Sequence, residues 1–413
     1  MNKLRTAFYT ISGFLFLGMS AKAGGQNTGT TLLGAQTTIQ TVTTAVPFLM
    51  IAPDARAGGM GDAGVATSPD ANSDHWNASK LAFAEDKMGF AVSYVPWLRT
   101  LVPDINMAYL SGYYKPTKDQ SFYGSLRYFS MGDITFTDVV GNTIGQFRPN
   151  EFAIDGGYAR KLADNFSVAM TGRFIYSDLT NGVAVQGAET HAGTAFAVDL
   201  SAYYRNNKVK VGDKKATLSF GTNLSNIGNK IAYSTSAQTD FLPINLRIGA
   251  ALKIDLDEYN SIVFALDLNK LMVPTPPIYK TDSTGAPVIN PLTGQQEILA
   301  GQNPNRGVVS GMFGSFTDAP YGWREELRDI DYALGMEYWY DKQFALRGGF
   351  FYENPLNGNR IFFTMGAGLK YNVFALDFSY LIPTDQRNPL ENTLQFTLFF
   401  NFDAMKADEK KPD

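Results

Sequence analysis

The residue types best suited to catalysis or ligand binding gather in one stretch, Pro53 to Phe83. Gly59 to Gly64 matches G-x-G-x-x-G, a spacing that holds a pyrophosphate when it joins a strand to a helix. Pro69 ends any helix within about two turns, and no strand–helix–strand pattern follows, which argues against a dinucleotide site. His75 beside Asp74 is half of a catalytic dyad, but no G-x-S-x-G elbow accompanies it. We interpret His75 as a packed, hydrogen-bonded residue.

The same stretch shows neither helical nor strand periodicity, and its many small residues give it no core of its own. Its backbone groups need water or an enclosing wall as hydrogen-bond partners. We expect the rest of the chain to provide that wall and residues 53–86 to form a plug inside it. The side chains expected to contact the wall are Asp54, Arg56, Asp62, Trp76 and Asn77.

The composition narrows the chemistry further. The 413 residues include no Cys and only two His, which excludes disulfides and thiolate metal sites. We predict no enzymatic activity, no metal and no cofactor. The formal net charge of −4 gives no basic surface for nucleic acid. Only 18% of the residues are charged and 13% are aromatic, a profile that suits strands facing two different solvents.

The N-terminal residues read as an export signal. A positive start is followed by an apolar run, Phe8 to Met19, and by Ala21-Lys22-Ala23, an A-x-A cleavage pattern. We predict a signal peptide over 1–23 and a flexible or loosely docked Thr- and Gln-rich arm over 24–52. No later stretch has the roughly 18 uninterrupted apolar residues of a membrane helix. This pattern fits a secreted protein, a periplasmic protein or an outer-membrane barrel.

From Lys87 onward the apolar period is two, in segments of about ten residues, the length of a tilted membrane strand. About fourteen segments predict an all-β transmembrane antiparallel barrel over 87–403, followed by a charged periplasmic tail over 404–413. A soluble sandwich also alternates, but its bulky side chains face inward and its charges outward. Here one face is bulky and apolar, and the other carries small, polar and isolated charged residues. The predicted strands begin near 88, 105, 120, 151, 165, 192, 216, 243, 260, 329, 343, 361, 373 and 392.

The connections between these segments alternate between long and short, as in outer-membrane barrels with short periplasmic turns. This parity places both termini, and with them the plug, at the periplasmic mouth. The longest connection, 270–327, is an extracellular loop. The charges on the inward face have both signs, which favours a lumen closed by pairing over an ion-selective pore, although a solvated open channel is the alternative. These charges are Arg127, Arg173, Arg247, Arg347, Lys370, Asp155, Asp199, Asp267, Glu337 and Asp377.

The stretch PDARAGGMGDAGVATSPDANSDHWN resembles the N-terminal signature of the PorV (LptO) family, outer-membrane barrels of the Bacteroidota type IX secretion system. That family is part of a wider group similar to FadL, the long-chain fatty-acid transporter, whose lumen holds an N-terminal hatch with an Asn-Pro-Ala signature. Asn77-Ala78-Ser79 stands at the matching positions and lacks the Pro. This departure weakens an expectation of FadL-type hatch gating more than it weakens the placement of the plug.

The resemblance implies a Gram-negative outer-membrane location and protein partners. It implies a SprA-like translocon barrel, cargo proteins with C-terminal sorting domains and a PorU-type attachment complex, together with membrane lipids. We expect the partner- and cargo-binding side chains in the long loop and in a second loop that contains Trp97 and Leu98. For the side chains of the long loop, packing over the lumen is the alternative. The candidates in the long loop are Met312, Phe313, Phe316, Tyr321 and Trp323. A FadL-like transporter of hydrophobic small molecules is the alternative function, and it predicts an apolar lumen pocket beside the plug.

Overall fold

The computed structural model describes residues 42–99, 102, 104–137, 140–182, 189–234, 239–385 and 388–401. The predicted signal peptide, most of the predicted arm and the predicted tail lie outside these residues. The described residues belong to one compact unit, Gln40–Asp413. None of the helices in them is long and apolar enough to cross a membrane.

Fourteen antiparallel strands close into a barrel, which confirms the predicted fold class and strand number. Neighbours along the chain pair with each other, and β1 closes the ring by pairing with β18 from Gly89↔Asn401 to Tyr94↔Phe396. Every strand begins within two residues of its predicted start. The strands are β1 (Met88–Pro96), β2 (Ile105–Thr117), β3 (Gln120–Met131), β6 (Asn150–Ala163), β7 (Phe166–Asp178), β8 (Gly193–Val211), β9 (Lys214–Gly228), β10 (Asn245–Asp255), β11 (Asn260–Leu271), β14 (Ile330–Tyr340), β15 (Phe344–Tyr352), β16 (Ile361–Tyr371), β17 (Phe374–Pro383) and β18 (Leu394–Asn401).

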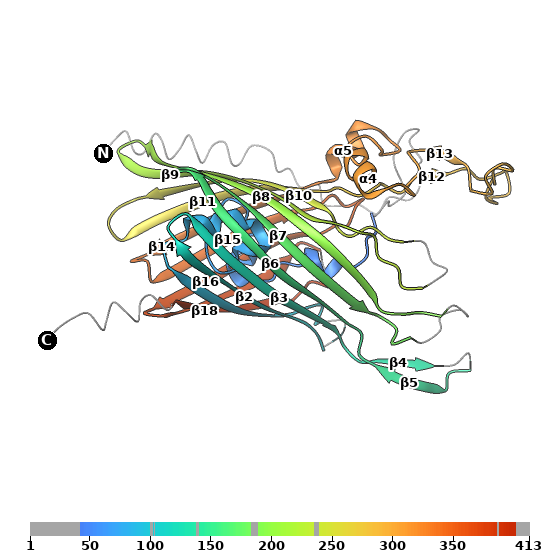
Figure 1. Cartoon of the computed structure of the whole chain (residues 1–413), viewed down its shortest axis with the longest axis horizontal. Helices are drawn as coiled ribbons and strands as arrows, with labels where there is room; N and C mark the ends of the chain where they lie inside the picture. The colour runs from blue at the N-terminus through green and yellow to red at the C-terminus, as the bar shows by residue number, and fades with distance from the viewer. Residues whose placement is uncertain are drawn as a thin grey trace. The chain divides into compact units, whose positions relative to one another are not determined.

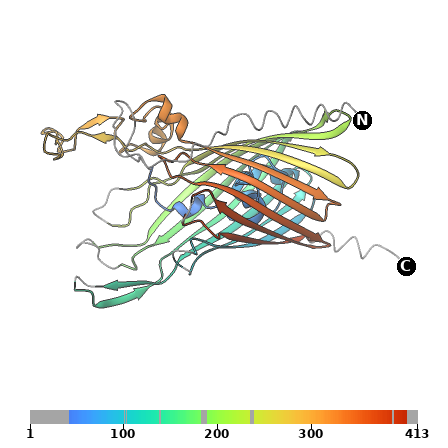
Figure 2. The same cartoon turned by 180° about the vertical axis from the view of Figure 1, so that it is seen from behind.

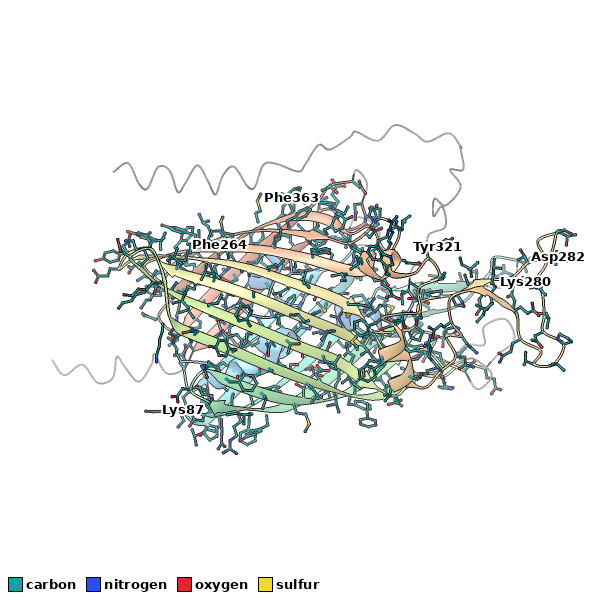
Figure 3. The ribbon with its side chains drawn as sticks, turned by 90° about the horizontal axis from the view of Figure 1, so that it is seen from above. Lys87, Phe264, Lys280, Asp282, Tyr321 and Phe363 are labelled. Atoms are coloured by element: carbon teal, nitrogen blue, oxygen red, sulfur yellow. The ribbon has the colours of Figure 1, made fainter. Side chains whose placement is uncertain are left out.

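The two faces of the barrel wall follow the period of two in the sequence. On β11, Phe264 points outward with 47% of its surface exposed, whereas Asp267 points inward and is 1% exposed. Phe264 and Phe363 both stand on the outside of the barrel in Figure 3. Exposed large apolar side chains on every side of the ring are the expected lipid contact of a transmembrane barrel.

The two rims differ as the loop parity predicts (Figures 1 and 2). We call the end with short connections, such as that between β16 and β17, the turn rim, and the opposite end the loop rim. The sequence did not reveal the local structure of the long connections at the loop rim. That structure consists of the hairpin of β4 (Ile134–Thr137) and β5 (Thr143–Phe147), the ribbon of β12 (Ile278–Tyr279) and β13 (Ile298–Ala300), and the helices α4 (Val308–Gly314) and α5 (Trp323–Arg328).

The described residues before β1, from 42 onward, lie inside the barrel and appear there in blue in Figure 1. They form four short helices joined by irregular backbone, although the sequence shows no helical period. Helices this short have little intrinsic stability, so contacts with the wall must hold them. They are η1 (Pro47–Met50), α2 (Ala55–Gly58), α3 (Ser73–Asn77) and η2 (Ala78–Phe83).

The prediction placed this segment at the periplasmic mouth, from which it can thread into the lumen, and the structure shows how far along the lumen its path reaches. Its start lies at the loop rim, where the Ala45 amide donates to the Phe241 carbonyl (2.9 Å) and Phe48 stacks on Phe129 at the end of β3. Its end lies at the turn rim, where Lys115 donates to the Ala82 carbonyl (3.1 Å). The segment therefore runs the length of the lumen. Strand parity constrains only where β1 begins, and it carries no information on how the preceding residues reach that point.

Candidate functional site

The candidate site is the lumen segment, residues 42–86, together with the wall around it and the loops above it. Its Gly-rich part approaches the wall backbone very closely. Gly61 has a φ of +67°, and its amide donates to Thr364 Oγ1 (2.8 Å). A Cβ atom at Gly61 would lie 2.5 Å from the Phe350 amide nitrogen, so only glycine fits there. The G-x-G-x-x-G pattern therefore serves wall contact and does not open a phosphate-binding helix.

Arg56 makes the strongest ionic contact between the segment and the wall. Its guanidinium binds both carboxylate oxygens of Glu337 on β14, at 2.9 and 2.8 Å. It also binds Asp70 within the segment at 2.8 Å. Glu337 in turn accepts from Arg347 (2.8 Å), which binds Asp377 (2.9 Å). Four buried charges and the half-buried Asp70 thus form one alternating network that joins Arg56 to inward charges of the wall.

The other predicted contact residues divide into two kinds. Asp54 caps α2 by accepting from the Ala57 amide (3.0 Å) and accepts from Trp76 Nε1 (2.6 Å), so this pair holds the segment to itself. Burial raises the pKa of Asp54 to about 6. Asn77 instead links segment and wall, because its amide donates to the carbonyls of Val65 and Ala202, each at 3.0 Å.

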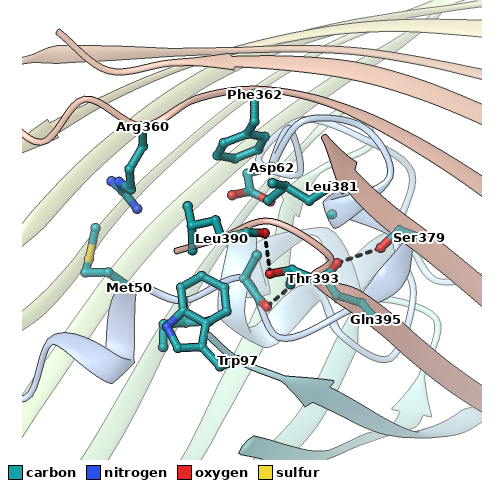
Figure 4. Close-up of a pocket in the computed structure, with 13 residues that line it drawn as sticks. Met50, Asp62, Trp97, Arg360, Phe362, Ser379, Leu381, Leu390, Thr393 and Gln395 are labelled. Carbon is teal, nitrogen blue, oxygen red and sulfur yellow. Dashed lines mark hydrogen bonds between the residues drawn. The ribbon is translucent and has the colours of Figure 1, made fainter. Parts of the chain in front are cut away.

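Asp62 lies half-buried at a small pocket of about 20 Å³ between the segment and the ends of β16 to β18 (Figure 4). Arg360 lines the same pocket, and Gln395 donates to the Ala52 carbonyl beside it (3.2 Å). Burial raises the pKa of Asp62 to about 7, and the positive charge of Arg360 opposes that shift. The small volume shows how closely the segment fits this part of the wall.

His75 occupies the middle of the lumen between two arginines. Its Nδ1 lies 2.6 Å from Arg127 Nη2, and its Nε2 lies 3.3 Å from Arg247 Nη1. Burial, followed by the two guanidinium charges, lowers the pKa of His75 well below its ordinary value. The Asp74 carboxylate does not touch the imidazole and accepts from Ser125 Oγ (2.8 Å). This arrangement is structural, and it provides no nucleophile and no paired acid–base group.

Sequence reasoning missed Lys80, which is buried and bridges parts of the segment. Its Nζ donates to the Gly64 carbonyl (2.6 Å), while the Gly64 and Val65 amides donate to Asp267 on β11 (2.7 and 2.8 Å). Burial lowers the pKa of Lys80 to about 8. The signal for Lys80 is a lone charge among small residues, the same signal that identifies Arg56.

Most of the inward charges lie where the strand period places them. Arg173 binds Asp155 (2.7 Å) and Asp199 (3.0 Å) in a second buried cluster. Lys370 is an exception, because it lies exposed near the turn rim and takes no part in the lumen network. At the last residues of a strand the wall ends, so strand period no longer decides burial.

The predicted partner residues divide into exposed and buried or partly buried ones. Phe313, Phe316, Tyr321 and Trp323 are exposed on and beside α4 and α5. Met312 is buried against Phe241, Ile244, Met272 and Val273. Trp97 and Leu98 are partly buried and line a cavity at the loop rim. Met312 is thus packed and not presented at the surface, whereas Trp97 and Leu98 face the cavity.

This second cavity, which we call the mouth cavity, has a volume of about 780 Å³ and opens at the loop rim. Phe48, Met50 and Ile51 of the lumen segment contribute to its apolar lining. Within the described residues, no group of three or more His, Cys, Asp or Glu side chains is arranged to hold a metal ion.

A closed antiparallel barrel with an apolar outer face and unequal rims is a transmembrane barrel of the outer-membrane class. The sequence matches the family described as type IX secretion system protein PorV over residues 34–278. The chain therefore belongs to the PorV family, and it is an outer-membrane component of the type IX secretion system.

Solved structures with a similar barrel have low sequence identity to this chain. The toluene transporter TodX of Pseudomonas putida is 11% identical, with a TM-score of 0.47 over 88% of this chain and 98% of that one. The CymD monoaromatic hydrocarbon channel is 12% identical, with a TM-score of 0.44 over 85% and 97%. A FadL homologue of Pseudomonas aeruginosa is 10% identical, with a TM-score of 0.39 over 88% and 99%. No curated protein matches the chain.

Proposed function

We propose that this chain is a non-enzymatic carrier that binds a SprA-like translocon barrel and passes cargo proteins to the cell surface. The cargo proteins carry C-terminal sorting domains, and the receiver is a PorU-type attachment complex. Family membership supports this function. The observation that carries it is the long connection between β11 and β14, which builds two surfaces with exposed apolar side chains at the loop rim.

The first surface is the ribbon that β12 and β13 begin, which extends away from the barrel with Asp282 near its far end (Figure 3). Lys280 pairs with Glu297 across it (2.9 Å). Leu292 is 94% exposed. We take this fully exposed leucine on a projecting ribbon as a candidate contact with another protein.

The second surface is the aromatic group on α4 and α5: Phe313, Phe316, Tyr321 and Trp323. Partly buried ion pairs fix the backbone beneath it. Lys270 on β11 binds Glu326 (3.1 Å) and Asp329 (3.3 Å), and Arg306 binds Asp318 (2.9 Å). Aromatic side chains on a fixed backbone lose little entropy on binding, which makes them efficient anchors.

Co-purification from detergent-solubilised outer membranes tests the function. Deletion of residues 313–323 is expected to reduce recovery of the translocon barrel or of cargo. Tyr371→Ser, which changes an exposed aromatic at the turn rim, is the matched control and should leave recovery unchanged. Full recovery of both partners with the deletion variant would show that this surface is not the binding site. Absence of both partners from the wild-type complex would contradict the proposed function itself.

A FadL-like transporter of hydrophobic small molecules is the second candidate, and the mouth cavity favours it. Apolar side chains make up most of the lining of that cavity, as in many small-molecule sites. This candidate predicts a lipid or similar molecule that co-purifies with the barrel and reduced fatty-acid uptake in a deletion strain. Normal uptake together with a ligand-free barrel in native mass spectrometry would exclude it.

A further inference from the structure

The mouth cavity combines an apolar lining with an excess of negative charge. Five carboxylates line it and only one guanidinium, that of Arg360. The carboxylates are Glu151, Asp240, Asp329, Asp331 and Glu353. Arg360 is already paired with Glu353 (2.8 Å), and Lys270 reaches Asp329 from outside the lining (3.3 Å). The cavity therefore favours a ligand that brings positive charge on an apolar body.

Glu151 is the most distinctive of these carboxylates. It begins the inward face of β6 and is 1% exposed. Its Oε1 accepts from Ser177 Oγ (2.6 Å), and Ser177 accepts from Tyr233 (3.0 Å). Among the described residues, Glu151 Oε2 has no hydrogen-bond partner. A buried carboxylate oxygen without a partner is costly, and an incoming cationic donor removes that cost.

The shape of the cavity distinguishes a protein segment from a small free molecule. Its volume is that of a small-molecule site, roughly 300–1,000 Å³, but it opens at the loop rim and its lining runs from the segment around to the loop before β16. A small ligand in so open a space leaves much of its surface in water. Val273 lines the cavity and also packs with Met312 on α4, so the helix that carries part of the aromatic surface packs beside the cavity wall.

We propose that the mouth cavity receives an extended segment of a partner protein in which a Lys or Arg side chain is flanked by apolar residues, with Glu151 binding the cation. This inference rests on the proposed function, because it supplies the recognition chemistry for a protein docked on the loop rim. The apolar neighbours of the cation pack on Phe48, Met50 and Ile51. The body of the partner stays outside, against α4 and α5.

Fluorescence anisotropy on the purified barrel in nanodiscs tests this proposal. The probe is a labelled short peptide of alternating Val and Thr with one central Lys, and the matched probe carries Glu in place of Lys. We expect the Lys peptide to bind more tightly than the Glu peptide. Glu151→Gln keeps the shape of the side chain and removes its charge, so it should lower the affinity for the Lys peptide at least about tenfold. Asp133→Asn changes an exposed carboxylate at the loop rim outside the cavity and should have no effect.

Glu151→Gln is expected to fold, because it removes an unpaired buried charge, and its unfolding midpoint should equal or exceed that of the wild type. Equal binding of the two peptides, or an unchanged affinity in Glu151→Gln, would overturn the proposal. Binding of decylamine in the absence of any peptide binding would assign the cavity to a small amphiphile and would also overturn it. If peptide binding fails while the translocon and cargo still co-purify, the carrier function stands and only this inference falls.

Discussion

At the scale of single residues, the lumen depends on largely buried charges that pair with one another. Arg56 joins the segment to Glu337 in a bidentate pair and also binds Asp70. Removing one member of such a buried group leaves its partners charged and incompletely paired, which costs more than the intact pair contributes. Arg56 is therefore the residue whose loss should most weaken the attachment of the segment.

Arg56→Met is expected to lower the free energy of unfolding by about 3 kcal/mol, because Asp70 loses a buried partner and Glu337 keeps only Arg347. Denaturant titration followed by Trp fluorescence measures this change. Arg148→Met breaks the exposed Arg148–Asp133 pair (2.8 Å) and serves as the control, with no measurable change expected. A decrease in the free energy of unfolding as small as that of the control would show that the Arg56 network does not hold the segment.

His75 should give the stability a pH dependence of known sign. The native state keeps the imidazole neutral because its pKa is well below the ordinary value of 6.5, whereas the unfolded chain takes up a proton near that value. The contribution of His75 is therefore present above about pH 6.5 and is lost as the pH falls below it.

Carboxylates with raised pKa values, such as Asp54 and Asp62, have the opposite effect, because their contribution to stability grows as the pH falls. Both the wild type and His75→Gln contain these carboxylates, so their effect cancels when the two proteins are compared. The difference in unfolding free energy between wild type and His75→Gln should then shrink as the pH is lowered from 7.5 to 5. Denaturant titrations at several pH values measure it. A difference that stays constant or grows toward low pH would contradict a neutral buried imidazole.

At the scale of elements, the barrel wall and the loop-rim surfaces are separable. The backbone of the ribbon from Lys280 to Glu297 is hydrogen-bonded to itself, for example from the Val288 amide to the Lys280 carbonyl (3.1 Å). The wall strands are held by their ladders and by the lumen segment. The ribbon is thus a binding element that the barrel does not need in order to close.

Deletion of residues 282–296 should leave the barrel folded, because no wall strand loses a neighbour. The heat-modifiable shift of the barrel on gel electrophoresis should keep its wild-type transition temperature. Deletion of η2, which contacts β6, β7 and β8 at the turn rim, is the comparison and should lower that temperature. A large decrease on ribbon deletion would show that the ribbon supports the wall.

At the scale of the whole molecule, the chain segment inside the barrel favours a carrier with a closed lumen over an open pore. The segment contacts the wall from the loop rim to the turn rim, and its contacts include ion pairs, backbone hydrogen bonds and close glycine packing. We therefore propose that residues 53–86 act as a plug under resting conditions.

Single-channel recordings on the purified protein should show no large, steady conductance. Arg56→Met should produce brief openings more often, because it weakens the attachment of the segment. A large and continuous wild-type conductance would overturn the plug and favour the solvated channel. The same recordings with Arg148→Met provide the control.

The sequence by itself determined the features that depend on short-range pattern. The period of two and the alternation of loop lengths predict fourteen strands, their starts and the two rims, because a strand that faces lipid on one side and a lumen on the other must alternate. Small residues with isolated charges also mark Pro53 to Phe83 as an enclosed segment. Arg56 and Asn77, two residues of that segment, contact the wall.

Only the tertiary structure decided the features that depend on long-range contact. These are the direction of the segment, the pairing of Arg56 with Glu337, the burial of Met312 and the unpaired oxygen of Glu151. Each joins residues far apart in the chain, and no local period encodes which inward charge meets which. The physical reason is that closure of the barrel brings fourteen inward faces together at once, and the pairing inside is settled by geometry across the lumen.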